Sequence, residues 1–178
     1  MRIIAGRLGG RTFQSPGNRR THPMSDKMRG ALFNILGDMQ GLTVLDPFGG
    51  SGALAFEAVS RGANKVLVLD NDKNAQRTIV ENTRELRLEG RINLVRAGAG
   101  AWLSTSRGAV FDVVLCDPPY DDLQPSLLAR LSACVAAEGV LVLSYPGLQP
   151  ALVFDGLEQI KQQAYGDAQL IFYRAAAG

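Results

Sequence analysis

The chain has 178 residues, of which 46% are hydrophobic and 20% charged, an ordinary composition for a soluble globular protein. This length suits one domain with a proper core and is too short for two full ones. No stretch approaches the roughly 20 apolar residues that cross a bilayer. Arg2, Arg7 and Arg11 interrupt the first residues, so we expect a cytoplasmic protein without a signal segment.

The net charge of +2 hides an uneven distribution along the chain. Residues 1–30 contain seven basic residues and one acidic residue, a net charge of +6, which leaves −4 on the remainder. A basic segment on an acidic body is typical of a protein that binds a polyanion. The alternative is a solubilising basic tail. An ordered structure argues against a mere tail, because residues 2–5 and 11–14 flank Gly9-Gly10 and predict a short β-hairpin.

The rest of the chain alternates helix and strand. Ser25 is placed to cap a helix whose apolar side chains recur with helical period. Strands are predicted near residues 42–46, 65–70, 91–96, 110–116 and 139–145, with helices between them, and an antiparallel hairpin at residues 157–164 and 168–174. This order predicts a mostly parallel sheet with right-handed crossovers and one reversed strand at the end.

A glycine-rich stretch follows the first of these strands. It reads Asp46-Pro47-Phe48-Gly49-Gly50-Ser51-Gly52 and leads into a helix that Gly62 closes. Glycines let a backbone approach a ligand closely, and a helix amino terminus presents N–H groups. The spacing also matches the dinucleotide fingerprint, with Ala55 in its third place. The motif alone therefore leaves a nicotinamide cofactor, S-adenosylmethionine and a plain strand-to-helix turn open.

The second strand ends in an acidic residue, Asp70. An acidic side chain at this place in an α/β sheet accepts hydrogen bonds from ribose hydroxyls. Asn71 and Asp72 come next and are placed to cap the following helix. We assign the ribose role to Asp70 and the capping role to its neighbours.

The most informative residues are Asp117-Pro118-Pro119-Tyr120, directly after the apolar run at residues 113–116. The prolines fix φ and cannot donate, which directs their carbonyls outward. A carboxylate beside an outward carbonyl can accept both hydrogens of a planar amino group, and Tyr120 offers a ring for base stacking. The motif predicts a clamp for an exocyclic amine of a nucleobase, in a geometry that lets the nitrogen attack a methyl group. The alternative is an Asp-Pro turn.

In this order, the glycine-rich stretch, Asp70 and Asp117-Pro118-Pro119-Tyr120 resemble amino-group methyltransferases that use S-adenosylmethionine. Residues 1–7, 21–26, 31–36 and the closing hairpin narrow the resemblance to the RsmD family of 16S rRNA guanine-N2 methyltransferases. That family implies a Rossmann-like class I methyltransferase fold, a mostly parallel seven-stranded sheet with an antiparallel closing strand. It also implies methyl transfer from S-adenosyl-L-methionine to N2 of a guanine.

The resemblance assigns roles to individual residues. The catalytic residues would be Asp117, Pro118 and Tyr120. The cofactor-binding residues would be Asp46, Phe48, Gly50, Gly52, Asp70, Asn71, Ala99 and Asp117. The RNA-binding residues would be Arg7, Arg11, Arg19 and Arg20. We expect residues 1–24 to form an RNA-contacting hairpin and loop and residues 25–178 a monomeric methyltransferase domain without a metal, acting on ribosomal RNA or the small ribosomal subunit.

The chain departs from the family pattern in three places. His22 and Met24 replace an Arg and a Thr. Residues 96–100 lack the usual Asp or Asn, so an adenine contact there, at Gly98 or Ala99, would come from backbone groups. The fifth strand ends in Ser144-Tyr145 instead of Glu. None of these changes touches Asp117 or Gly50.

Three rival functions differ in what they need. A DNA adenine-N6 or cytosine-N4 methyltransferase would share the clamp but normally carries a separate target-recognition region. A nicotinamide-dependent oxidoreductase has no use for the Asp117 motif. A non-catalytic RNA-binding protein would tolerate loss of Asp117, which is present.

Overall fold

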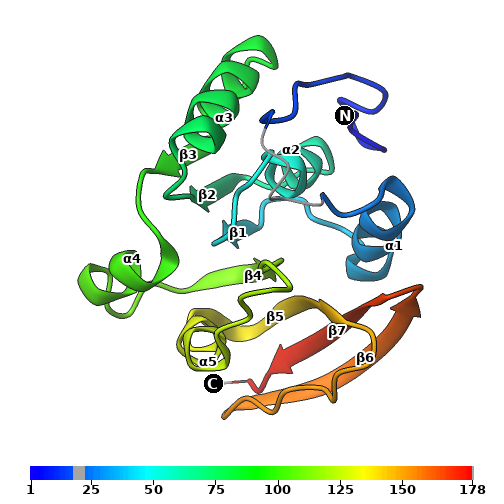
Figure 1. Cartoon of the computed structure of the whole chain (residues 1–178), viewed down its shortest axis with the longest axis vertical. Coiled ribbons are helices and arrows are strands. Elements are labelled where there is room, and N and C mark those ends of the chain that lie inside the picture. Colours follow the sequence, from blue (N-terminus) through cyan, green and yellow to red (C-terminus); the bar gives the residue numbers. More distant parts are fainter. Residues whose placement is uncertain (18–22, 178) are drawn as a thin grey trace.

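The computed structural model describes residues 1–17 and 23–177 (Figure 1). Its strands are β1 (Thr43–Asp46), β2 (Lys65–Leu69), β3 (Ile92–Val95), β4 (Phe111–Cys116), β5 (Val135–Pro146), β6 (Leu157–Tyr165) and β7 (Ala168–Ala175). Its helices are α1 (Asp26–Leu36), α2 (Ala53–Ser60), α3 (Lys73–Glu85), α4 (Ala99–Thr105) and α5 (Pro125–Ser132). Ser25 caps α1, as predicted, by accepting a hydrogen bond from the Met28 N–H at 3.1 Å.

All seven strands lie in one sheet, in the order β3-β2-β1-β4-β5-β7-β6. Strands β1 to β5 pair in parallel, while β7 is antiparallel to both β5 and β6. The predicted mostly parallel sheet with one reversed strand is therefore confirmed. One boundary was wrong, because β5 begins at Val135 and not near residue 139. Val135 pairs with Phe111 ahead of a register shift, and the positive φ of 63° at Glu138 makes this bulge resemble a turn.

Each face of the sheet packs against its own set of helices. Along β5, Val142 belongs to a core that α1, α2 and α3 complete, whereas Leu141 and Leu143 belong to a second core with α4 and α5. This alternation follows from the two-residue period of a strand. It also assigns a face to the polar residues near the strand ends. Asp46 and Ser144 lie on the α1–α2 face, two positions after Val44 and Val142.

Residues 1–16, which we call the N-terminal strap, lie over α2 on this same face (Figure 1). The predicted hairpin is not formed as two strands. The strap contains one isolated antiparallel bridge, Arg2 with Thr12, and a bond from the Ile3 N–H to the Arg11 carbonyl at 2.9 Å. The chain leaves this pairing after Ile3, and the N–H groups of Ile4 and Ala5 donate instead to the Glu57 carboxylate, at 2.8 and 3.1 Å.

Buried polar side chains anchor the strap along its length. Ser60 on α2 accepts the Leu8 N–H through its hydroxyl at 2.9 Å and donates to the Ala5 carbonyl at 2.6 Å. The Phe13 ring packs edge-on against Phe56, with centroids 5.1 Å apart. Ile3 and Phe13 are buried in the same core as α1 and α2. The strap is therefore an ordered part of the fold and not a loose basic tail.

A buried ion cluster joins the strap to α1 and α2. Glu57 is fully buried and accepts from Arg61 Nε at 2.8 Å, and the equally buried Arg29 lies 3.9 Å from it. Arg29 also donates to the Arg2 carbonyl at 2.6 Å and to Asp26 at 3.1 Å. Because removing one partner would leave a buried charge without compensation, this cluster is expected to hold the strap firmly.

Candidate active site

The carboxyl ends of β1, β2 and β4 bring three carboxylates to one edge of the sheet. Asp46 is the last residue of β1, Asp70 directly follows β2, and Asp117 directly follows β4. Because β1 pairs with both β2 and β4, these residues come from three neighbouring strands. Open α/β sheets bind ligands at this edge, where the strand order reverses. The structure thus gathers the acidic residues that the sequence singled out.

Gly50 and Gly52, the two glycines predicted to bind the cofactor, are required for different structural reasons. Gly52 has φ of 84°, and a Cβ there would lie 2.7 Å from the Phe56 ring, so packing alone requires glycine. Gly50 has φ of 57°, but a Cβ on it would meet no described atom closer than the Phe48 carbonyl at 3.8 Å. Gly50 therefore faces open space, as expected of a backbone that a ligand approaches.

Asp70 holds the glycine loop in place. Its carboxylate accepts the Gly50 N–H at 2.8 Å and the Asp72 N–H at 2.8 Å. Burial raises the pKa of Asp70, and these two bonds oppose that rise. Asp72 caps α3 by accepting the Ala75 N–H at 2.8 Å, which confirms the capping prediction. Each carboxylate oxygen of Asp70 keeps a further lone pair that can accept from a hydroxyl.

Asp46 is the most unusual group at this edge. Only 1% of it is exposed, and neither carboxylate oxygen has a hydrogen-bond partner among the described residues. Burial, and next the negative charge of Asp117, raises the pKa of Asp46 to about 8, while the nearby Phe48 N–H opposes the rise without forming a bond of good geometry. A buried carboxylate without partners is costly, so this residue fits a ligand that brings a positive charge.

The predicted amine clamp lies beside Asp46. Asp117 is half-buried, and burial raises its pKa to about 6, a rise that the Ser144 hydroxyl partly offsets. Pro118 is buried and Pro119 exposed. Tyr120 is 40% exposed, and its hydroxyl lies 2.6 Å from Ser144 Oγ. The ring is thus accessible to a stacking base while its hydroxyl is held from β5. From the sequence, Ser144 was noted only as a departure from the family pattern, and its contact with Tyr120 was not predicted.

Gly98 and Ala99, where an adenine contact was expected, lie at the start of α4, near two other residues named for cofactor binding. A Cβ on Gly98 would lie 3.3 Å from Asn71 Nδ2, so Asn71 borders this position. Ala99 begins α4 and is buried, and Phe48 is half-buried against the same core. Ala99 has no exposed side chain to offer, which leaves its backbone and the exposed Asn71 as the groups available there.

Of the predicted RNA-binding residues, Arg7 and Arg11 lie exposed on the strap. Arg11 also donates to the Glu85 carbonyl at 3.2 Å. Arg19 and Arg20 lie outside the described residues, as does His22. The Arg7 N–H donates to the Ser60 carbonyl at 2.8 Å, so Arg7 and Arg11 both lie beside the C-terminal ends of α2 and α3, toward the amino ends of the strands and away from the acidic edge.

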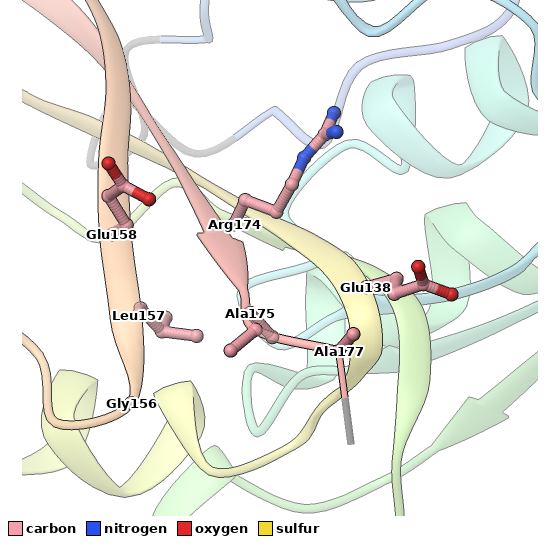
Figure 2. A pocket seen from close by; sticks show the side chains of 8 residues that line it. Glu138, Gly156, Leu157, Glu158, Arg174, Ala175 and Ala177 are labelled. Atoms are coloured by element: carbon pink, nitrogen blue, oxygen red, sulfur yellow. The ribbon is translucent and has the colours of Figure 1, made fainter.

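A cavity of about 500 Å³ lies elsewhere, lined by residues that include Glu138, Glu158 and Arg174 (Figure 2). Arg174 pairs with Val140, so the cavity is at the amino ends of the parallel strands, opposite the acidic edge. Within residues 1–17 and 23–177, no cluster of three or more metal-ligating side chains is found. In the same part of the chain, the helices are too short or too polar to cross a membrane.

Comparison with known proteins gives consistent matches. The family model described as Conserved hypothetical protein 95 matches residues 1–174. Ribosomal RNA small subunit methyltransferase D of Escherichia coli is 32% identical over 124 residues, which cover 67% of this chain and 60% of that protein. YlbH of Bacillus subtilis is 33% identical over 134 residues, 74% of this chain and 73% of that protein.

Solved structures agree over the full length. The structure of yhhF from Escherichia coli has a TM-score of 0.87 at 26% identity and covers 100% of this chain and 99% of that one. The hypothetical protein TTHA0928 of Thermus thermophilus has a TM-score of 0.81 at 28% identity, with the same coverage of both chains.

Proposed function

Because this chain belongs to the Conserved hypothetical protein 95 family, the RsmD family that its motifs resemble, we propose that it is a ribosomal RNA methyltransferase. Its cofactor is S-adenosylmethionine, and its target is the exocyclic N2 of a guanine in 16S rRNA. The chain matches only 60% of the length of the Escherichia coli enzyme. We therefore assign the guanine target from the Asp117-Pro118-Pro119-Tyr120 clamp as well as from the similarity to that enzyme.

The observation that carries this proposal is the unpartnered Asp46. The cofactor carries two positive charges, one on its sulfonium and one on its ammonium group. These charges would complement the carboxylates of Asp46 and Asp117, neither of which has a basic partner among the described residues. Asp70 would accept from the ribose hydroxyls, and Gly50 leaves room for the methionine end. When bound, the cofactor supplies an activated methyl group on a good leaving group.

The chain's own contribution to the chemistry is to orient the amine. Asp117 and the Pro118 carbonyl accept the two hydrogens of N2, which turns the nitrogen lone pair toward the methyl. Bound S-adenosylmethionine would supply the methyl group, and Asp117 or water would take up the proton that the methylated nitrogen loses. Holding both reactants in line supplies most of the rate, in keeping with the large effect of proximity.

The strap would hold the RNA backbone on the α1–α2 face. Arg7 and Arg11 lie beside the C-terminal ends of α2 and α3, so the RNA would run from there along this face before one base reaches Tyr120 at the opposite end of the strands. A guanine in a stacked or paired context must be extruded to reach the clamp. The exposed part of the Tyr120 ring then stacks on it.

The proposal is tested by cofactor binding and product mapping together. Calorimetry should detect binding of S-adenosylhomocysteine and none of NADH. Transfer of labelled methyl to 16S rRNA, followed by nucleotide analysis, should yield N2-methylguanine. Tight NADH binding without S-adenosylhomocysteine binding would contradict the cofactor assignment, and a methylated adenine or cytosine would contradict the target.

A further inference from the structure

Ser144 occupies a fixed position at the acidic edge. Its strand, β5, lies between β4 and β7, and Ser144 itself pairs with Leu170. The side chain is 2% exposed and lies on the α1–α2 face with Asp46. A serine on an inner strand of a sheet has little freedom to move, so whatever its hydroxyl holds is held precisely in place.

Tyr120 needs such support. It follows two prolines in the turn after β4, and 40% of its surface is open to solvent. An exposed ring in a loop can rotate, which would vary the plane offered to a base. The bond of 2.6 Å between its hydroxyl and Ser144 Oγ fixes the far end of the ring. Stacking is sensitive to ring orientation, since aromatic groups attract only in certain geometries.

The same hydroxyl also influences the other half of the clamp. It opposes the rise that burial causes in the pKa of Asp117. A serine hydroxyl has one hydrogen and two lone pairs. It can therefore accept from the Tyr120 hydroxyl while it donates toward Asp117. The side chain that the structure shows it to bond is Tyr120.

We propose that Ser144 is a positioning residue for methyl transfer, which holds the Tyr120 ring in the orientation that receives the guanine. This inference rests on the proposed function and adds a residue to it. It predicts that the Tyr120 hydroxyl matters, and not only its ring, because Phe at this position would lose the bond to Ser144.

The test is a double-mutant cycle in single-turnover methyl transfer to 16S rRNA. Ser144→Ala and Tyr120→Phe should each slow transfer roughly tenfold, because loss of one positioning hydrogen bond misaligns the reactants. The double variant should be no slower than either single variant, since both changes remove the same bond. Ser144→Thr keeps the hydroxyl and should recover most of the rate.

Two controls separate positioning from folding. Affinity for S-adenosylhomocysteine and the unfolding temperature should stay near the parent values. Ser132→Ala removes another buried serine, one whose hydroxyl bonds the Ala129 carbonyl at 2.7 Å on α5, and should leave transfer unchanged. Methylation of 16S rRNA by the parent protein, measured first, tests the proposed function separately. With an active parent, a parent-like rate for Ser144→Ala, or single losses that multiply in the double variant, would overturn the role of Ser144.

Discussion

The buried side chain of Asn82 on α3 pairs with both backbone polar groups of Gln14. Asn82 Oδ1 accepts the Gln14 N–H at 3.0 Å, and Asn82 Nδ2 donates to the Gln14 carbonyl at 2.8 Å. The amide thus replaces one step of a strand ladder and fastens the end of the strap. Arg11, three residues earlier, is one of the basic residues proposed to contact RNA. The position of the proposed RNA-binding surface therefore depends on a residue of α3.

Replacing Asn82 tests this dependence. Asn82→Ala leaves two polar groups of Gln14 without partners and should lower the free energy of unfolding by about 1–3 kcal/mol. RNA affinity should fall while S-adenosylhomocysteine affinity stays at the parent value. Asn82→Asp keeps the acceptor but sets a carboxylate oxygen against the Gln14 carbonyl, so it should restore neither the parent stability nor the parent RNA affinity. Chemical denaturation and RNA titration measure the two effects, and unchanged RNA affinity in Asn82→Ala would show that the strap does not need this anchor.

The basic residues of the strap should give RNA binding its salt dependence. If Arg7 and Arg11 each contact a phosphate, the double Ala variant should bind RNA more weakly and lower the slope of log affinity against log salt by about two. Arg107→Ala with Lys161→Ala removes the same charge from exposed positions off the strap. That control pair should keep the parent slope. Equal slopes in all three proteins would mean that the strap does not contact phosphates.

Asp46 should make the protein without cofactor less stable as pH rises. The pKa of Asp46 is about 8 in the folded protein and near 3.8 in the unfolded chain. Between these values the folded state binds more protons, so stability falls with rising pH, by at most roughly 1.4 kcal/mol per unit. Asp46→Asn should flatten this decline, and Asp155→Asn, at an exposed position, should not. Thermal unfolding from about pH 5 to pH 8 provides the comparison, and identical slopes for the parent and Asp46→Asn would rule out a buried protonated Asp46.

The same carboxylates should couple cofactor binding to proton release. With a pKa of about 8, Asp46 is mostly protonated at neutral pH, so a bound cation must displace its proton, whereas Asp117, with a pKa of about 6, keeps a proton mainly below neutral pH. Affinity for S-adenosylmethionine should therefore increase from about pH 6 to pH 8. S-adenosylhomocysteine lacks the sulfonium charge, so its affinity should increase less. Calorimetry in buffers of different ionisation enthalpy counts the released protons, and equal counts for both ligands would contradict a site built for the sulfonium.

Much of the architecture follows from local sequence patterns. Apolar runs that end in Asp46, Asp70 and Asp117 predicted parallel strands with acidic carboxyl ends, and the structure has them. Such predictions succeed because parallel strands of one sheet share a common edge, so residues at their ends must meet.

Contacts between distant segments were not predictable in this way. The expected hairpin is shorter than predicted: residues 1–3 pair with residues 10–13, and beyond them Glu57, which reads as a helix surface residue, is buried and takes the N–H groups of Ile4 and Ala5. The bond between Tyr120 and Ser144 joins two different strand ends, and neither residue signals the other along the chain. Pairing across elements is decided by tertiary packing, which a local pattern does not contain.

The central claim is that Asp117 orients an amine for methylation. Asp117→Ala removes one acceptor and leaves the Gly50 loop and Asp46 intact, so affinity for S-adenosylhomocysteine should persist. Asp117→Asn keeps one oxygen acceptor and should retain more activity than Ala. The most direct measurement is single-turnover transfer of labelled methyl to 16S rRNA by saturating enzyme and cofactor. We predict a rate at least about 100-fold lower for Asp117→Ala, whereas transfer at the parent rate would contradict the amine clamp and leave the motif as a structural turn.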